Sequence, residues 1–154
     1  MSTPTVLPSF WDRLRQPGKD RLHTRRTLTL AELEDAVRAD VETLLNQRRP
    51  RSSGLSVAVR QTIVGYGLPE LNGFDIKSQA GIEDLCLAIQ DTVRMFEPRL
   101  ENVTVGVAET NAPVVFRVQA DFRIEPVKER IQFRAILEAG GSALKVERTG
   151  SLWT

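Results

Sequence analysis

Hydrophobic residues recur at three- and four-residue steps from position 81 onward, which is the spacing of one face of an α-helix. They are Ile82, Leu85, Cys86, Ile89, Val93 and Phe96. The helix is predicted to end at about Phe96 or Glu97, because Pro98 has no backbone N–H and disfavours helical geometry in the residue before it. Glu97 and Arg99 are therefore expected at the corner between this helix and the next element.

Two further helices are predicted upstream. Thr29-Leu-Ala-Glu32 has the pattern of a capping box and opens a helix that runs to about Asn46. A shorter helix is expected from Ser56 to Val64 and should end at Gly65-Tyr-Gly67, where Gly67 can adopt the left-handed conformation of a C-cap. The expected inward positions are Leu30, Leu33, Val37, Val41 and Leu44 in the first, and Leu55, Val59 and Ile63 in the second.

Beyond the corner, the hydrophobic period changes from that of a helix to the two-residue alternation of strands. Strands are predicted over residues 103–108, 114–125, 131–137 and 143–148, with turns at Asn111-Ala-Pro113 and Gly140-Gly141. Their short connections favour an antiparallel meander. The predicted fold is α+β, with amphipathic helices packed on one face of an antiparallel four-stranded sheet.

The last predicted strand is a candidate open edge, because only a short tail follows it. An open edge presents unpaired backbone groups that can accept a strand from another chain. Leu144, Lys145 and Val146 are therefore candidate partner-binding residues.

The composition is that of one globular domain. The chain has 154 residues, of which 41% are hydrophobic and 27% are charged, and its formal charge of +1 does not favour general nucleic-acid binding. The expected organisation is an N-terminal arm at 1–27, a domain at 28–150 and a tail at 151–154. The arm contains Phe10 and Trp11, which either pack back onto the domain or dock on a neighbouring protein.

Location and cofactor chemistry follow from what the sequence contains. The single cysteine, Cys86, reads as a small buried residue in a reducing compartment, and no secretory h-region or membrane-spanning run is visible, so a cytoplasmic location is expected. His23 is the only histidine, and it lies in the N-terminal arm, so catalytic triads that need a histidine and metal sites that need several histidines are not expected. No metal and no cofactor is predicted.

Carboxylates and arginines leave two weaker possibilities open. A glycosidase needs two carboxylates across a cleft, and Glu97 could be one of them, although nothing in the sequence marks its partner. A basic loop could bind phosphate or an acidic surface, although such arginines are more often simply solvated. The residues concerned are Asp75, Glu70 or Glu101 as the second carboxylate, and Arg48, Arg49 and Arg51 in the loop.

The tetrapeptide Glu97-Pro98-Arg99-Leu100 lies between the long helix and the first strand, and Tyr66-Gly67-Leu68-Pro69 precedes it. This arrangement resembles the baseplate wedge family of contractile injection machines, and more narrowly the TssE subfamily of bacterial type VI secretion systems. The resemblance spans roughly residues 10 to 148 and includes the opening Phe10-Trp-Asp-Arg-Leu14. Gly65 departs from the family pattern, which has asparagine before Tyr-Gly.

The resemblance implies a structural, non-enzymatic protein. It implies the wedge proteins TssF and TssG as partners, TssK in the same assembly, and a sheet edge that templates the sheath proteins TssB and TssC. The family motif corresponds to Glu97, Pro98 and Arg99, which with Leu100 form either a latch for a wedge partner or an internal salt bridge that pins the corner. The rival is a peptidoglycan hydrolase that uses Glu97 as general acid, because lysozyme-like activity has been proposed for some phage relatives.

Overall fold

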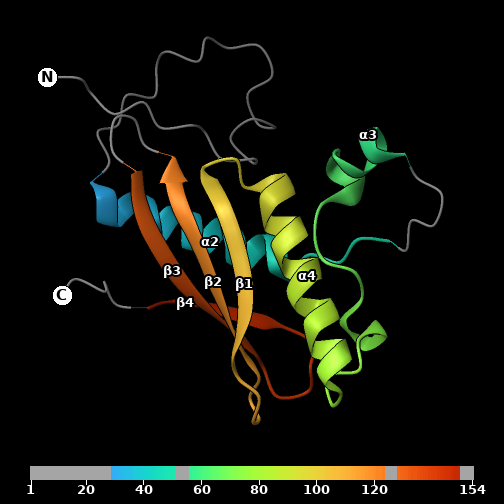
Figure 1. The fold of residues 1–154 in the computed structure, drawn as a ribbon. Coiled ribbons are helices and arrows are strands. Elements are labelled where there is room, and N and C mark those ends of the chain that lie inside the picture. Colours follow the sequence, from blue (N-terminus) through green and yellow to red (C-terminus); the bar gives the residue numbers. More distant parts are fainter. Residues whose placement is uncertain (1–28, 51–55, 124–127, 150–154) are drawn as a thin grey trace, which may run out of the picture.

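A computed structural model describes residues 29–50, 56–123 and 128–149. Two long helices and a four-stranded sheet make up most of this part of the chain (Figure 1). The elements are α2 (Leu30–Asn46), α3 (Val57–Arg60), η1 (Ile63–Gly65), η2 (Leu71–Gly73), α4 (Gln79–Phe96), β1 (Leu100–Glu109), β2 (Val115–Arg123), β3 (Lys128–Leu137) and β4 (Leu144–Arg148).

Helix α2 begins at the predicted capping box. The Thr29 side chain accepts a bond from the backbone N–H of Glu32, and the Glu32 carboxylate accepts one from the backbone N–H of Thr29 at 2.8 Å. These bonds satisfy two of the N–H groups that every helix start leaves unpaired. Four of the five predicted inward residues are buried together with Leu45, and the fifth, Leu30, is 39% exposed.

Helix α4 confirms the predicted apolar face and its end. Ser78 caps the first turn by accepting a bond from the backbone N–H of Gly81 at 3.0 Å, so the helix begins two residues earlier than the apolar pattern indicated. All six residues of the predicted face are buried, including Cys86. The helix ends at Phe96, as expected from the proline two residues later.

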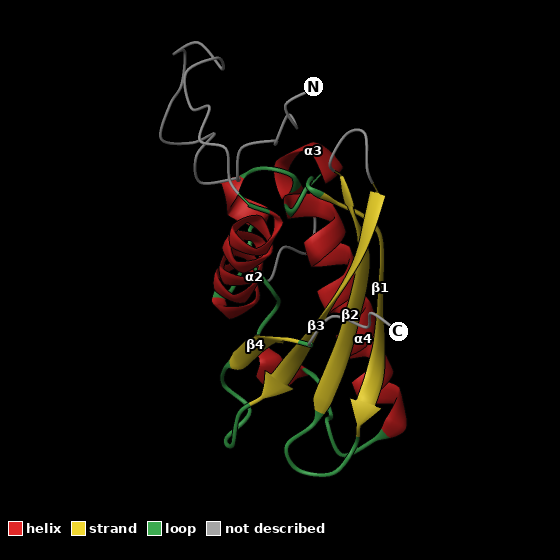
Figure 2. Ribbon diagram, turned by 90° about the vertical axis from the view of Figure 1, so that its left-hand side faces the viewer, coloured by secondary structure: helices red, strands yellow, loops and turns green. Residues whose placement is uncertain are grey.

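The four strands form a meander in the order β1-β2-β3-β4, with every neighbouring pair antiparallel. Helices α2 and α4 both lie on one face of the sheet, and the other face carries no helix among the described elements (Figure 2). The α+β fold and its layer arrangement are therefore confirmed. The core fills the space between the layers and includes Val118, Phe116, Phe122, Phe133 and Val146.

The predicted turns join the strands, with one departure in burial. Gly140 and Gly141 both have positive φ angles, 101° and 68°, a backbone region where a side chain would be strained. Val115 was expected on the polar face of its strand, yet it is only 1% exposed. The C-terminal part of the prediction for that strand, Ile124 and Glu125, lies outside the described residues.

The predicted helix from Ser56 to Val64 is wrong in its length and in the direction of its apolar residues. The segment forms only α3 and the separate 3-10 turn η1. Val59 and Ile63 are 36% and 57% exposed, and α3 buries none of its residues. The segment is too short to lay an amphipathic face on the core, and its inward residue is Gly65, at which a Cβ would lie 1.9 Å from the Arg60 carbonyl oxygen.

The segment after η1 returns the chain to the core. Gly67 has a φ of 109°, and a Cβ there would lie 2.4 Å from the Gln47 carbonyl oxygen, so glycine is required both by its conformation and by close packing. Leu68 is fully buried and forms a parallel bridge with Arg48. This bridge joins the end of α2 to the Tyr66-Gly67-Leu68-Pro69 motif. In the described part of the chain, no helix combines the length and the hydropathy needed to span a bilayer.

Candidate functional site

The corner between α4 and β1 is held by a buried ion pair. The Arg99 guanidinium grips the Glu97 carboxylate with two parallel bonds, Nε to Oε1 and Nη2 to Oε2, both 2.6 Å. The backbone N–H of Arg99 also donates to Oε1 at 3.2 Å. The side chains reach each other because Pro98 ends the helix and places the residues on either side of it in one tight turn, in which the Leu100 N–H donates to the Glu97 carbonyl at 3.1 Å.

A third residue, Asp40 of α2, completes this cluster. Its Oδ2 accepts a bond of 2.5 Å from Nη2 of Arg99, 59 positions away in the sequence. The Glu97 and Arg99 side chains are 4% and 5% exposed, whereas the Asp40 side chain is 30% exposed. One guanidinium facing two carboxylates leaves the cluster with a formal charge of −1, and that charge reaches solvent at Asp40.

The surroundings of Arg99 keep it ionised. Burial lowers the pKa of the guanidinium, but the bonds to Glu97 and Asp40 and the charges of those carboxylates outweigh burial and raise the pKa. Removing one partner of a buried ion pair costs about 3–5 kcal/mol of folding free energy, because an uncompensated charge is left behind. Of the two roles left open by the sequence, the internal salt bridge is the one that this geometry shows.

The two other residues of the tetrapeptide have different surroundings. Leu100 is 5% exposed and belongs to the hydrophobic core, so its side chain is not available to a partner in this conformation. Pro98 is half-buried at the surface of the turn. Pro98 and Asp40 are therefore the parts of the corner that another protein can touch.

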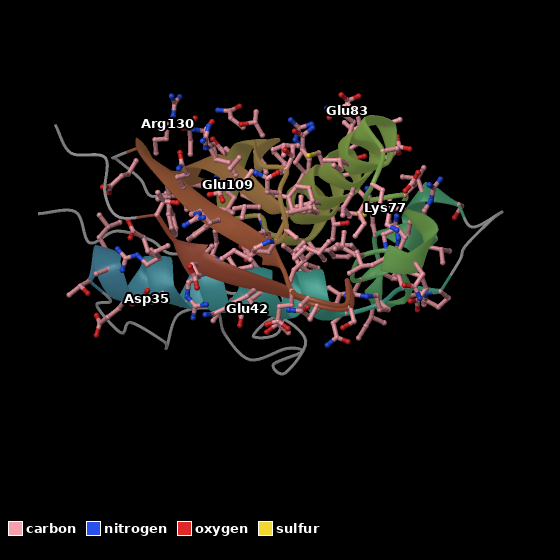
Figure 3. All side chains as sticks on the ribbon, turned by 90° about the horizontal axis from the view of Figure 1, so that it is seen from below. Asp35, Glu42, Lys77, Glu83, Glu109 and Arg130 are labelled. Carbon is pink, nitrogen blue, oxygen red and sulfur yellow. The ribbon has the colours of Figure 1, made fainter. Side chains whose placement is uncertain are left out.

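The expectation of an open edge at β4 is wrong at Leu144 and Val146, because side chains of α2 bond to the outward backbone groups of these two residues. The Leu144 N–H donates to Oδ1 of Asn46 at 2.9 Å, and the Leu144 carbonyl accepts from Nδ2 of Asn46 at 2.7 Å. The Val146 N–H donates to Glu42 at 2.8 Å, and its carbonyl accepts from Arg38 at 3.0 Å. Figure 3 shows α2 alongside β4, with Glu42 labelled on the helix.

This cover makes use of two different spacings. Outward backbone groups recur every second residue of a strand, and side chains on one helix face recur about every fourth residue. Arg38, Glu42 and Asn46 therefore bring donors and acceptors to both Leu144 and Val146. Lys145 does not take part, because its side chain is exposed and pairs with Glu147 at 2.9 Å. Partner binding by these three strand residues stays a prediction, and a strand added here would have to displace α2 side chains.

The opposite margin of the sheet, β1, is covered only along its first half. Arg94 of α4 donates to the Val103 carbonyl with Nε at 3.0 Å and Nη2 at 2.7 Å, and Gln90 accepts from the Val105 N–H at 3.2 Å. Val107 is two residues further along, in unbroken register with β2, so its backbone groups also face outward. Within the described residues, no side-chain hydrogen bond from α4 extends beyond Val105.

Glu97, the candidate general acid, and Arg48 of the basic loop both make contacts within the protein. Both carboxylate oxygens of Glu97 are engaged by Arg99, and burial closes them to a sugar chain, so the residue is poorly placed to act as a general acid. In the basic loop, Arg48 donates to the carbonyls of Leu45 and Ser142, both at 2.7 Å, and thereby ties α2 to the β3–β4 turn. Arg51, Phe10 and Trp11 lie outside the described residues.

Sequence reasoning missed Asp40 and the polar residues that cover β4. In the sequence, Asp40 was one of many acidic residues on the polar side of a helix, and only its approach to Arg99 distinguishes it. Glu42 lies four residues after Arg38, so their ion pair at 3.3 Å was the one available signal for the cover.

Comparison with known families agrees with this description. A family model described as baseplate wedge protein gp25 matches residues 31–127, which include α2 apart from its first residue, the buried ion pair and the first two strands. The comparisons with curated proteins and with solved structures gave no significant match.

Proposed function

The chain belongs to the baseplate wedge protein gp25 family, and from that premise we propose that it is the TssE-like wedge subunit of a type VI secretion baseplate. Membership supports a structural role in a phage-tail-like baseplate, in contact with other baseplate components. The proposal adds cytoplasmic assembly with TssF and TssG, in a complex that also contains TssK.

The observation that carries the proposal is the ion-pair cluster at the corner. Arg99 bonds to Glu97 and Asp40 and so joins α2 to the turn between α4 and β1. A corner built in this way is rigid, because the planar guanidinium fixes the orientation of both carboxylates. It holds Pro98 and the excess negative charge of Asp40 at the surface, where a basic side chain of a wedge partner can pair with Asp40. Glu97 and Arg99 then act as positioning residues behind this contact.

The test is binding of the purified chain to a co-expressed TssF–TssG complex, measured by biolayer interferometry. Wild type is expected to bind, and Asp40→Asn, which keeps the shape and removes the charge, is expected to bind on the order of tenfold more weakly. Asp35→Asn is the matched control, because it makes the same change on the same helix at a side chain that is 59% exposed and paired with Arg148. A folded wild-type chain that does not bind TssF–TssG would refute the wedge assignment. Equal binding by Asp40→Asn would refute the role of the corner alone.

The proposal also covers sheath templating by strand addition. Because α2 covers β4, the sheet margin better placed to accept a strand of TssB or TssC is the second half of β1, around Val107. This assignment is independent of the corner. A substitution at this margin of β1 is therefore expected to leave wedge assembly intact while preventing the baseplate from initiating a sheath.

A further inference from the structure

Four aliphatic side chains are exposed within eight residues of α3 and η1. Val57, Val59, Ile63 and Val64 are 61%, 36%, 57% and 47% exposed. Together with Arg60 they are called the α3–η1 patch below. Only three other large hydrophobic residues of the described chain are as exposed, and they are spread over α2 and α4. Exposed apolar residues that gather in one place mark interaction surfaces more often than single ones do.

The patch is held in shape by local bonds. Ser56 accepts a bond from the Val59 N–H at 3.4 Å, and the Thr62 hydroxyl donates to the Val59 carbonyl at 2.6 Å and accepts from the Val64 N–H at 3.4 Å. Gly65 then packs directly against the Arg60 carbonyl, with no room for a side chain. The aliphatic side chains are thus presented on an ordered turn, which lowers the entropy cost of binding a partner.

The charged side chains of the segment that contains the patch are of one sign. Residues 43–69 contain four arginines and no aspartate or glutamate. Arg48 is used internally, but Arg60 is exposed and has no ion-pair partner among the described residues. A partner that covers the aliphatic side chains therefore gains by bringing carboxylates to their border.

The backbone of the patch indicates the shape of the partner. The N–H groups of Arg60, Gln61, Thr62, Gly65 and Tyr66 all donate to carbonyls within the segment. An added strand would find few free backbone groups here, whereas a helix satisfies its own backbone and needs only side-chain contacts. We propose that the α3–η1 patch binds an amphipathic helix of another protein, whose apolar stripe is bordered by carboxylates.

This surface shares no residue with the two described above, and it lies near the corner, which begins where α4 ends at Phe96. Figure 1 shows α3 beside the C-terminal end of α4, on the opposite side of the molecule from the start of α2. In the described chain, α3 contacts mainly η1 and buries no residue in the core. Substitutions in the patch should therefore leave both the fold and the cluster of Arg99, Glu97 and Asp40 intact.

The test uses two synthetic amphipathic peptides and the full-length chain. Each peptide carries leucines along one face, bordered by glutamates in the first and by lysines in the second, and binding is measured by fluorescence anisotropy. The wild-type chain should prefer the glutamate peptide. Ile63→Ser should weaken that binding on the order of tenfold, and Arg60→Glu should shift the preference toward the lysine peptide. Leu87→Ser is the matched control, since Leu87 on α4 is 56% exposed, nearly the same as Ile63.

Several results would overturn the proposal. Equal binding of both peptides, or equal weakening by Leu87→Ser and Ile63→Ser, would show non-specific hydrophobic adsorption. Association of the chain with itself in analytical ultracentrifugation, lost in Ile63→Ser, would identify the patch as a contact between copies. Binding to phosphatidylglycerol vesicles in place of the glutamate peptide would identify a membrane surface as the occupant. Thermal unfolding of each variant, expected to match wild type, separates these outcomes from loss of the fold.

Discussion

The Arg99 guanidinium bonds to two carboxylates that come from different elements. Glu97 is its neighbour across Pro98, and Asp40 is on α2. Exposed ion pairs in this chain, such as Arg123 with Glu101 at 3.4 Å, contribute about 0–1 kcal/mol. The Arg99 pairs differ because Glu97 and Arg99 are almost completely removed from water. Deleting one partner therefore leaves a buried charge without its counter-charge, and this determines how much the pair matters for stability.

Arg99→Ala is expected to lower the free energy of unfolding by about 3–5 kcal/mol, because the buried Glu97 carboxylate loses its counter-charge. Arg99→Lys should restore only part of this loss, since an ammonium group cannot form the two parallel bonds. Urea denaturation followed by circular dichroism measures both effects. Arg123→Ala serves as the exposed control and should change stability by less than about 1 kcal/mol. A loss for Arg99→Ala no larger than that of the control would contradict the structural role of the ion pair.

The Cys86 thiol is expected to react slowly in the folded protein. Burial, and after it the negative charge of Glu83, raises the pKa of this thiol, and the reactive form is the thiolate. Labelling with dithionitrobenzoate at about pH 8 should be slower in the folded chain than in urea, and it should accelerate as the pH rises. Unfolding should also become easier above about pH 8.5, because the unfolded thiol ionises there first. Equal labelling rates with and without urea would refute this prediction.

At the scale of elements, α2 has two separate functions in the fold. One face buries Leu33, Val37 and Val41 in the core. The neighbouring face carries Arg38, Glu42 and Asn46 along the outer margin of β4, where a fifth strand would otherwise pair. A margin covered in this way is protected against unwanted association between sheet edges.

Asn46→Ala should uncover part of this margin. The Leu144 N–H and carbonyl both lose a partner, which is expected to cost about 1–3 kcal/mol and to favour association of the chain through β4. Chemical denaturation gives the first quantity, and light scattering over a range of protein concentrations gives the second. Thr43→Ala on the same helix is the control, because the Thr43 hydroxyl bonds only to its own helix at Ala39. Light scattering that is identical for the two variants would show that the cover does not restrain association.

At the scale of the molecule, the described surface offers three candidate partner-binding surfaces of different kinds. They are the corner with Pro98 and Asp40, the second half of β1, and the α3–η1 patch. The margin of β4, which α2 covers, is no longer the preferred site for adding a strand of another protein. This distribution is consistent with a subunit that contacts other baseplate components, as family membership indicates.

Val107→Pro tests the margin of β1. Its N–H faces away from β2, so proline removes a donor for an incoming strand without removing a ladder bond within the sheet. Baseplates carrying this variant should assemble with TssF and TssG but fail to initiate a sheath of TssB and TssC, as seen by electron microscopy. Val107→Ala keeps the N–H and is expected to support sheath growth. Sheaths of normal length on Val107→Pro baseplates would exclude this margin as the template.

Much of the fold was predictable because its determinants are local and periodic. The capping box at Thr29, the apolar face of α4 and the alternation along β2 each indicated an element that the structure confirms. The segment at Val59 and Ile63 was not predictable in the same way. Its short apolar spacing suited a buried helix, but whether an apolar side chain faces the core depends on what lies beside it. Among the described elements, α3 contacts mainly η1.

The sequence by itself determined the two long helices, the strands and the proline-fixed corner, because each depends on residues close together in the chain. Only the tertiary structure decided which charges meet at that corner and which margin of the sheet stays open. Asp40 reaches Arg99 across 59 positions, and Asn46 reaches Leu144 across 98. Contacts over such separations follow from how α2 packs against the sheet, and no local pattern of residues records that packing.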